Sequence, residues 1–317
     1  MGPTFRFDPF TGEHVLLSPG RAGKPTGHED RLPTPAGPCP FCPGNEASGI
    51  TLAVLPTDAP WQVRTLANRY PAVRPDAPDD ADGKGARGAH EVIVEGRDHD
   101  RDLPTLAASV RRLVLRAYRD RVAALEQSAG YVHLFRNRGL RAGSSQPHPH
   151  AQVLATEHIA EAVQRRWQRA ERFYTKHGLS LLQGVLANEL ADGRRVVRTT
   201  PAFVVLCPIA PRLDGETWIV PRDRGAFSQL DPARLDALAD LLGETLPAVL
   251  DLGRSSYNLV WRQPPAVQRD HPGAFWTLEI LPRGGASAGY EQSSESALVT
   301  LPPEEAARRI RRSLGTA

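Results

Sequence analysis

Hydrophobic and polar positions follow a definite order in the central part of the chain. Residues 91–95 and 131–135 are short apolar runs of the kind found in strands, and residues 148–154 alternate as a strand with one polar face does. Between the first two runs, apolar side chains recur at close to helical spacing over residues 106–125. This order predicts a strand, a helix and two further strands.

The same order recurs further along the chain. Residues 216–220 have a strand pattern, and Asp231 and Pro232 then provide an N-cap and a first helical residue for an apolar stripe of leucines. Residues 257–261 and 275–281 are again strand-like. We therefore predict two copies of one strand–helix–strand–strand unit.

The first ninety residues have a different character. They are rich in Pro, Gly and Asp and hold short strand-like segments at residues 14–17 and 61–66, between turn signals. The polar, Asp-rich and Gly-rich residues 75–87 predict a loop.

The duplication locates the chemistry in the first copy. Aligning the last strands of the two copies pairs three residues of one with three of the other: His148 with Phe275, His150 with Thr277, and Gln152 with Glu279. At these aligned positions imidazoles occur in the first copy alone, so we predict one active site per chain, with the second copy as a scaffold or a substrate-contact surface.

Residues two apart on a strand share a face, which places His148, His150 and Gln152 together with Pro149 opposite. One interpretation is a polar outer face or a structural histidine pair. The other is a nucleophile with supporting groups, because a neutral imidazole attacks phosphorus well. The preceding residues 137–146 offer small side chains, hydroxyls and backbone N–H groups that suit phosphate oxygens.

A cysteine pair, Cys39 and Cys42, lies in a loop rich in Pro and Gly. Two cysteines at this spacing supply half of a tetrahedral zinc site, and the remaining ligands must come from elsewhere. His148 and His99 are good candidates, but spacing alone does not select His99 over His90 or His133. A pair without any metal is the alternative.

Composition narrows the class of protein. The chain has 317 residues, 40% hydrophobic and 24% charged, which is ordinary for a soluble globular protein. A net charge of +3 is too small to indicate a nucleic-acid surface. Three cysteines form no disulfide framework, and no apolar run has the length of a signal peptide or a membrane span, so we expect a cytoplasmic protein without membrane contact.

At these residues the chain resembles the galactose-1-phosphate uridylyltransferase family, a branch of the histidine-triad superfamily. Residues 37–46 and 145–152 carry the most specific motifs, and residues 17–25, 67–72 and 289–291 match more weakly. The resemblance implies an α+β fold of two histidine-triad-like halves, each an antiparallel sheet with a packed helix, forming one extended pseudo-duplicated unit. The first half, with the zinc loop and nucleophile strand, would span residues 1–180, and the second, residues 181–317, would lack the catalytic histidines.

The resemblance also implies roles for individual residues. The catalytic residues are the nucleophile His150 and the phosphate-binding Gln152, and the ligands of one structural zinc ion are Cys39, Cys42, His99 and His148. The substrate-binding residues are Asn137, Gly143, Ser144 and Ser145 near the phosphates, Arg21, Asn68 and Arg69 at the nucleotide, and Tyr290 and Glu291 at the sugar. Members of the family are usually homodimers that share sugar contacts across subunits.

Three departures from the family pattern matter. Phe275 stands where many members have a histidine of a second metal site, and Arg224 where some have another, so we predict no second metal. Ala151 follows the nucleophile where glycine is frequent. Residues 68–72 are closer to members similar to ADP-glucose phosphorylase, which leaves uracil and adenine both open as the base.

The predicted function is ping-pong nucleotidyl transfer from a sugar nucleotide through a covalent nucleotidyl-histidine, most simply to a hexose 1-phosphate as in the uridylyltransferases. Phosphorolysis of a sugar nucleotide such as ADP-glucose is the alternative with inorganic phosphate as acceptor. A nucleotide hydrolase and a zinc-containing nucleotide-binding protein with a degenerate site are the remaining hypotheses.

Overall fold

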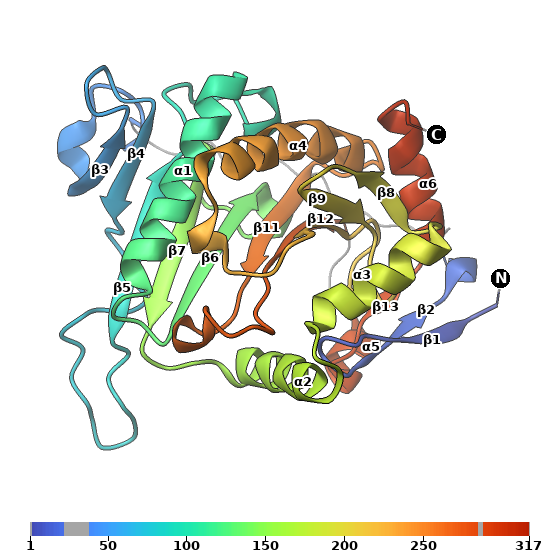
Figure 1. Cartoon of the computed structure of the whole chain (residues 1–317). Coiled ribbons are helices and arrows are strands. Elements are labelled where there is room, and N and C mark those ends of the chain that lie inside the picture. Colours follow the sequence, from blue (N-terminus) through green and yellow to red (C-terminus); the bar gives the residue numbers. More distant parts are fainter. Residues whose placement is uncertain (1, 22–37, 285–287, 317) are drawn as a thin grey trace.

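One large antiparallel sheet forms the centre of the molecule (Figure 1). The computed structural model describes residues 2–21, 38–284 and 288–316. Ten strands of this part form the sheet, in the order β3 (Thr51–Leu55), β4 (Val63–Ala67), β5 (Gly88–Val94), β7 (His150–Thr156), β6 (Tyr131–Arg138), β11 (Ser256–Arg262), β12 (Thr277–Arg283), β10 (Thr217–Pro221), β9 (Phe203–Leu206) and β8 (Val196–Thr199).

The middle of the sheet is a duplicated unit. The order β5-β7-β6 of the first copy is followed by β11-β12-β10 of the second, so each strand has its counterpart at the same distance from the junction of β6 with β11. The register agrees, because Phe135 pairs with Gln152, Val260 pairs with Glu279, and Phe135 and Val260 pair with each other. The predicted two-copy fold and the alignment of Gln152 with Glu279 are therefore confirmed.

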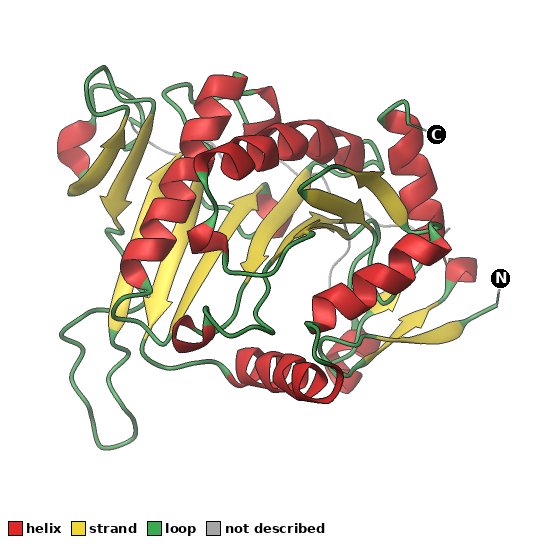
Figure 2. Cartoon of the chain, viewed as in Figure 1, coloured by secondary structure: helices red, strands yellow, loops and turns green. Residues whose placement is uncertain are grey.

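Helices α1 (Ala108–Leu125) and α4 (Pro232–Leu250) cover one face of this sheet side by side (Figures 1 and 2). The side chain of Asp231 caps α4 by accepting a hydrogen bond from the backbone N–H of Arg234, and Pro232 begins the helix as predicted. The largest apolar cluster lies between these two helices and the sheet. α6 (Pro303–Ser313) contributes to the same cluster.

The opposite face is covered differently in the two halves. In the second half, α2 (Glu161–His177), α3 (Leu181–Asp192) and Phe10 pack against apolar side chains of β9, β10 and the segment before β12. The corresponding apolar cluster contains no residue of β5, β6 or β7. The polar side chains of β7 therefore lie on the face of the first half that α2 and α3 do not cover.

The pattern-based prediction missed α2 and α3. The signal for α3 is present, because Ser180 and Gln183 form a capping box at its start. The sequence of α2 is polar and fully buries Ala170 alone, and only Trp167 and Phe173 add partly buried apolar contacts beside it, so its apolar stripe is narrow.

Two predicted strands begin two residues later than expected. β7 begins at His150 rather than at residue 148, and β12 begins at Thr277 rather than at residue 275. In β7 the reason is Pro149, which has no N–H to donate to a neighbouring strand. Its carbonyl still accepts a hydrogen bond of 3.1 Å from the backbone N–H of Glu95. Residues 75–87 form a loop, as predicted, and β5 begins directly after it.

A small second sheet joins the two ends of the chain. β1 (Thr4–Phe7) and β2 (His14–Leu17) pair with each other, and β2 pairs in parallel with β13 (Leu298–Val299), which follows the short helix α5 (Gly289–Ser294). Strands β1 and β2 thus form one sheet with a C-terminal strand, and the division of the chain at residue 180 stays a prediction. Residues 22–25 and 37 of the family motifs lie outside the described residues.

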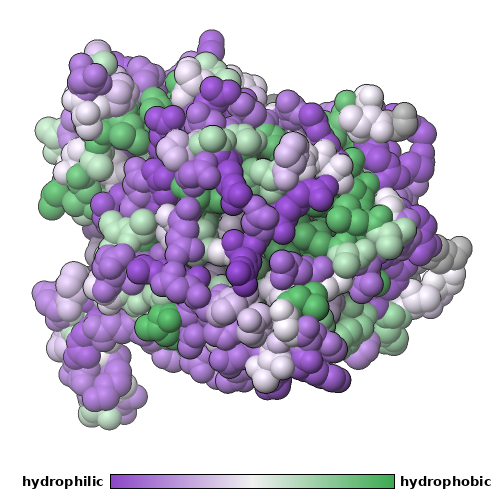
Figure 3. Space-filling model, viewed as in Figure 1, coloured by the Kyte–Doolittle hydropathy of each residue, from purple (hydrophilic) through white to green (hydrophobic). Residues whose placement is uncertain are grey.

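The outer surface is mainly hydrophilic on the side that carries α1 and α4. Figure 3 shows hydrophobic residues gathered in a smaller area on the side of α3 and α6. Within the described ranges, no helix combines the length and apolar character that crossing a bilayer requires.

A buried carboxylate occupies the position in the second half that corresponds to Gln152. Glu279 is fully buried, and Arg212, Arg262 and Arg166 reach its oxygens at 2.6, 3.2 and 3.6 Å. Burial would raise the pKa of Glu279, but the three guanidinium groups outweigh burial and lower it to about 2. The carboxylate therefore neutralises Arg166 and Arg262, for which the described residues offer no other ion pair, and shares Arg212 with Glu216.

Glu279→Gln is expected to lower the free energy of unfolding at pH 7 by roughly 3 kcal/mol, because it leaves the guanidinium groups of Arg166 and Arg262 without their anion. Urea denaturation measures this, and the exposed Glu13→Gln serves as the matched control with a change below about 0.5 kcal/mol. Since the folded-state pKa is below the ordinary 4.5, the difference between wild type and variant should narrow as the pH falls from 4.5 towards 2. Equal stability of Glu279→Gln and wild type at pH 7 would contradict the assignment.

Candidate functional site

His150 stands at the start of β7 with one ring nitrogen already used. The backbone carbonyl of His148 lies 2.9 Å from Nδ1 of His150, and a carbonyl can only accept a hydrogen bond. Nδ1 therefore carries the proton and donates it, so in the neutral ring Nε2 has a free lone pair. This is the tautomer that a nucleophilic imidazole needs.

The surroundings of His150 keep its ring neutral. Burial, with smaller contributions from the guanidinium groups of Arg136 and Arg138, lowers the pKa of His150 to about 4. Only 7% of the residue is exposed. At neutral pH the ring is thus neutral, with its single proton on Nδ1.

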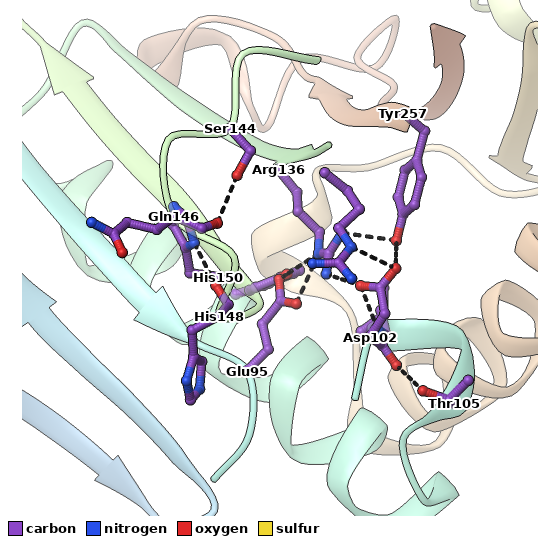
Figure 4. Close-up of polar contacts among 12 residues, drawn as sticks. Glu95, Asp102, Thr105, Arg136, Ser144, Gln146, His148, His150 and Tyr257 are labelled. Carbon is purple, nitrogen blue, oxygen red and sulfur yellow. Dashed lines mark hydrogen bonds and ion pairs between the residues drawn. The ribbon is translucent and has the colours of Figure 1, made fainter. Parts of the chain in front are cut away.

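A buried ionic network lies beneath this position, and Figure 4 shows it converging on Arg136. The fully buried Arg136 contacts Glu95 at 2.8 Å, donates to the Tyr257 hydroxyl at 2.8 Å, and forms an ion pair with Asp102. Tyr118 of α1 also donates to Glu95. The network ties β6 to β11 and to the segments that follow β5. The sequence analysis missed it, although Arg136 occupies a helix-facing position in β6 where an apolar side chain is usual.

Asp102 extends this network to the loop before the nucleophile. Burial would raise the pKa of Asp102, but Arg136 and Arg138 outweigh it and hold the pKa below its usual range. Arg138, which pairs with Asp102 at 3.3 Å, also donates to the carbonyl of Pro147 at 2.8 Å. The end of the loop is therefore held by the guanidinium group of Arg138, which the ion pair with Asp102 keeps in place.

The loop between β6 and His148 is built around two glycines. Gly139 has φ 84°, and a Cβ at this position would meet the side chain of Ser256, so no other residue fits. Gly143, with φ 79°, has open space around it and is exposed together with Ser145. Ser144 is buried and donates to the carbonyl of Gln146 at 2.9 Å, which Figure 4 shows. Its hydroxyl therefore serves the loop, and Gly143 and Ser145 are the exposed positions.

Cys39, Cys42, His99 and His148 form one cluster. Their donor atoms all lie within 4.8 Å of one another, with sulfur–nitrogen separations of 3.8, 3.4 and 3.6 Å. A tetrahedral zinc ion with ordinary bond lengths separates sulfur and nitrogen ligands by roughly 3.5 Å. His148 also approaches the carbonyl of Gly96 with Nε2 at 2.9 Å, which places its proton on Nε2 and leaves Nδ1 for a metal. The donor set and its geometry fit a metal ion.

The structure selects among the histidines that spacing left open. His99 lies beyond the end of β5 with its Nδ1 3.4 Å from the Cys42 sulfur, whereas His90 lies within β5 and contacts Gln152. His133 stacks edge-on against Tyr131. His99 therefore completes the cluster.

Gln152 lies two residues along β7 from His150 and on the same face of the strand. Its Oε1 is 2.9 Å from Nε2 of His90, which also contacts the amide of Asn68. Asn68 in turn accepts a hydrogen bond of 2.9 Å from the backbone N–H of Tyr70. Arg69 stacks over the Tyr70 ring at 5.7 Å. The predicted nucleotide residue Asn68 is thus linked to the predicted phosphate residue Gln152 through His90, and Arg69 is its neighbour in the chain.

The remaining predicted substrate residues lie elsewhere in the fold. Arg21 ends a short 3-10 helix after β2, and Tyr290 and Glu291 belong to α5 before β13. In Figure 1 these segments flank the small sheet rather than the strands that carry His150 and Gln152. At the second-half position aligned with His148, the ring of Phe275 packs against Phe10 at 5.5 Å.

Comparisons with known proteins agree with this geometry. Residues 2–160 match the family model described as galactose-1-phosphate uridyl transferase, N-terminal domain. The chain is 27% identical to ADP-glucose phosphorylase of Arabidopsis thaliana, over 98% of this chain and 92% of that protein. It is 28% identical to galactose-1-phosphate uridylyltransferase of Rattus norvegicus, over 96% of this chain and 86% of that protein.

Solved structures give the same result. The crystal structure of the Arabidopsis thaliana ADP-glucose phosphorylase with bound ADP-glucose matches with a TM-score of 0.85 and 27% identity, over 98% of both chains. A uridylyltransferase structure matches with a TM-score of 0.77 and 28% identity, also over 98% of both chains. Since the family match spans half of the chain and the relatives match along nearly all of it, the chain belongs to the galactose-1-phosphate uridyl transferase family and is an enzyme of the nucleotidyltransferase type.

Proposed function

We propose that the protein transfers a nucleotidyl group from a sugar nucleotide to a phosphorylated acceptor through a covalent intermediate on His150. The observation that carries this proposal is the hydrogen bond from Nδ1 of His150 to the His148 carbonyl. It leaves Nε2 as the attacking atom of a ring that burial keeps neutral. The family relationship supplies the reaction class.

In the first step, Nε2 of His150 attacks the phosphorus attached to the nucleoside. An N–P bond forms, and the P–O bond to the departing hexose 1-phosphate breaks. The ring then carries a positive charge, which the His148 carbonyl stabilises by accepting the Nδ1–H. The amides of Gln152 and Asn137 and the exposed positions Gly143 and Ser145 hold the phosphate oxygens. In the second step an acceptor oxygen attacks the phosphorus, the N–P bond breaks and the ring returns to its neutral state.

The acceptor decides between two activities. With a hexose 1-phosphate as acceptor and uridine as the nucleoside, the enzyme is a uridylyltransferase. With inorganic phosphate it is a phosphorylase of ADP-glucose type, and a specific observation favours this second candidate: residues 68–72 resemble that branch, and the match to the ADP-glucose phosphorylase structure has a TM-score of 0.85 against 0.77 for the uridylyltransferase.

The proposed metal is a structural zinc ion held by Cys39, Cys42, His99 and His148. Two sulfur and two nitrogen donors in this arrangement suit zinc. Four protein ligands leave no open position for water or substrate, so the ion would stiffen the site rather than take part in the reaction. Burial and the neighbouring Cys39 thiol raise the pKa of Cys42 to about 11, an effect that a bound cation would offset.

We also propose a cytoplasmic homodimer. Free thiols that serve as metal ligands suit a reducing compartment. Arg21, Tyr290 and Glu291 flank the small sheet rather than the strand of His150, and an arrangement in which they complete the site of the partner subunit agrees with the shared sugar contacts that the family resemblance implies.

Brief incubation with ADP-glucose or UDP-glucose, without acceptor, is expected to add an adenylyl or uridylyl group to the protein. Intact-protein mass spectrometry measures the increment. His150→Asn should form no adduct, because it has no nucleophilic ring nitrogen, whereas the exposed His158→Asn should form it as wild type does. The nucleotide that labels the protein identifies the base.

Product analysis then separates the remaining hypotheses. Addition of galactose 1-phosphate or of inorganic phosphate should discharge the adduct and yield the corresponding nucleotide product. Release of a nucleoside monophosphate without any acceptor would instead indicate a hydrolase. Nucleotide affinity in wild type without an adduct or turnover would indicate a binding protein and overturn the proposal.

Metal analysis of the purified protein is expected to find about one zinc per chain, and Cys39→Ser should lower both zinc content and the melting temperature, because metal binding and folding are coupled. Cys207→Ala is the matched control. It removes a buried thiol outside the cluster and should cost about 1 kcal/mol of stability while the zinc stays bound. Zinc content unchanged in Cys39→Ser would refute the assignment of the ligands.

A further inference from the structure

Two amide side chains lie on the same face of the sheet as His150, and each has its oxygen engaged by another side chain. The Oε1 of Gln152 contacts His90, and the Oδ1 of Asn137 contacts Asn258. Among the described residues, no acceptor pairs with the Nε2 of Gln152 or the Nδ2 of Asn137. An amide has two ends of equal size and opposite polarity, so its orientation depends on such partners.

The orientation of Gln152 follows from a backbone group. The N–H of Ala72 donates to Nδ1 of His90 at 3.1 Å, and a backbone N–H can only donate. Nδ1 therefore carries the lone pair, and the neutral ring has its proton on Nε2. This Nε2–H lies 2.9 Å from Oε1 of Gln152, which accepts it. A flipped Gln152 would present its NH₂ to another donor, so the amide is held with its NH₂ turned away from His90.

Asn68 links this arrangement to the nucleotide residues. The backbone N–H of Tyr70 donates to its Oδ1, so its NH₂ is the group that faces His90. The Nδ2 atom lies 3.1 and 3.4 Å from the two ring nitrogens and thus approaches the ring itself rather than one lone pair. Asn68 and the backbone N–H of Ala72 therefore hold the ring of His90 in the orientation that it needs to donate to Gln152.

The orientation of Asn137 follows from groups that are equally unambiguous. Arg283 donates through Nε to Oδ1 of Asn258, and Nδ2 of Asn258 donates to the carbonyl of Ala142 at 2.9 Å. The same Nδ2 lies 2.8 Å from Asn137, which must present its Oδ1 as acceptor. The NH₂ of Asn137 is thus turned away from Asn258. Because Asn258 belongs to β11, the second half of the chain sets an amide of the first.

We propose that His90 and Asn258 are positioning residues that turn the amides of Gln152 and Asn137, so that both NH₂ groups face the substrate phosphates. This inference rests on the proposed function. Phosphate oxygens only accept hydrogen bonds, so an amide that presents its oxygen would repel them. Donors fixed in advance need no reorganisation when charge develops in the transition state, and the loss of such a donor is felt mainly in the rate.

A double-mutant cycle tests this for His90. His90→Phe removes both ring nitrogens, and Gln152→Ala removes the amide through which His90 would act. Single-turnover formation of the nucleotidyl adduct is followed by quenched-flow mass spectrometry. We expect His90→Phe to slow adduct formation at least about tenfold in the wild-type background and less than about twofold in the Gln152→Ala background.

A conservative variant separates positioning from packing. The amide of His90→Gln can place an N–H near the former Nε2 position, and it should restore most of the rate. Asn258→Asp keeps the shape of Asn258 but cannot donate to Asn137, so it should slow adduct formation in the wild-type background and have little effect in Asn137→Ala. An effect of His90→Phe of equal size in both backgrounds, or no recovery in His90→Gln, would overturn the inference.

The outcomes also distinguish this inference from the proposed function. An adduct in wild type that forms at the same rate in His90→Phe refutes the positioning role and leaves covalent transfer intact. If wild type forms no adduct, the same cycle is read on the affinity for ADP and UDP by calorimetry, and a coupling of at least about fivefold between His90 and Gln152 supports the positioning role alone. The absence of both adduct and binding removes the proposed function and this inference together.

Discussion

The candidate site depends on His148, because both ring nitrogens and the backbone carbonyl of this residue hold other parts of the site in place. Its Nδ1 faces the sulfur atoms of Cys39 and Cys42, its Nε2–H is bonded to the carbonyl of Gly96, and its own carbonyl accepts the Nδ1–H of His150. One residue therefore connects the cysteine loop, the end of β5 and the candidate nucleophile. The segment before β7, where Pro149 has no N–H to donate, is held mainly by side chains, with one backbone hydrogen bond from Glu95 to the Pro149 carbonyl.

The network on the other side of the sheet explains why the second half belongs to the site although it lacks the histidines. A buried guanidinium is costly unless its charge and donors are all satisfied, and Arg136 meets this requirement with Glu95, Asp102 and Tyr257. Tyr257 comes from β11, so the network can form only where β6 and β11 pair. The next residue, Asn258, lies on the opposite face and donates to the carbonyl of Ala142 in the loop between β6 and His148. The continuous sheet is therefore a requirement of the site.

The sequence pattern was sufficient to predict those parts of the fold that depend on neighbouring residues in the chain. The repeated strand–helix–strand–strand order and the start of α4 at Pro232 were predicted because apolar spacing and capping are local features. The cysteine pair predicted a metal cluster but left its fourth ligand open, because spacing does not say which histidine a chain reversal brings near. His99 and His90 lie nine residues apart, one beyond β5 and one within it, and they serve different groups. The role of His90 follows from the direction of its hydrogen bonds, and its partners Ala72 and Gln152 are distant from it in sequence.

The two copies carry residues with opposite hydrogen-bonding properties at one matching strand position, Gln152 in the first copy and Glu279 in the second. Gln152 is neutral, and a single neutral donor from His90 engages its oxygen, so its N–H groups remain for a ligand. Glu279, at the matching position, accepts from guanidinium groups and has no hydrogen to offer to a phosphate. Its charge would also repel one. In the second copy a carboxylate replaces the amide, and the aligned positions have no imidazole. These residues therefore stabilise the fold through ion pairs, whereas the N–H groups of Gln152 remain available for the proposed ligand. The proposed single site per chain therefore agrees with the electrostatics of these two positions as well as with the histidines.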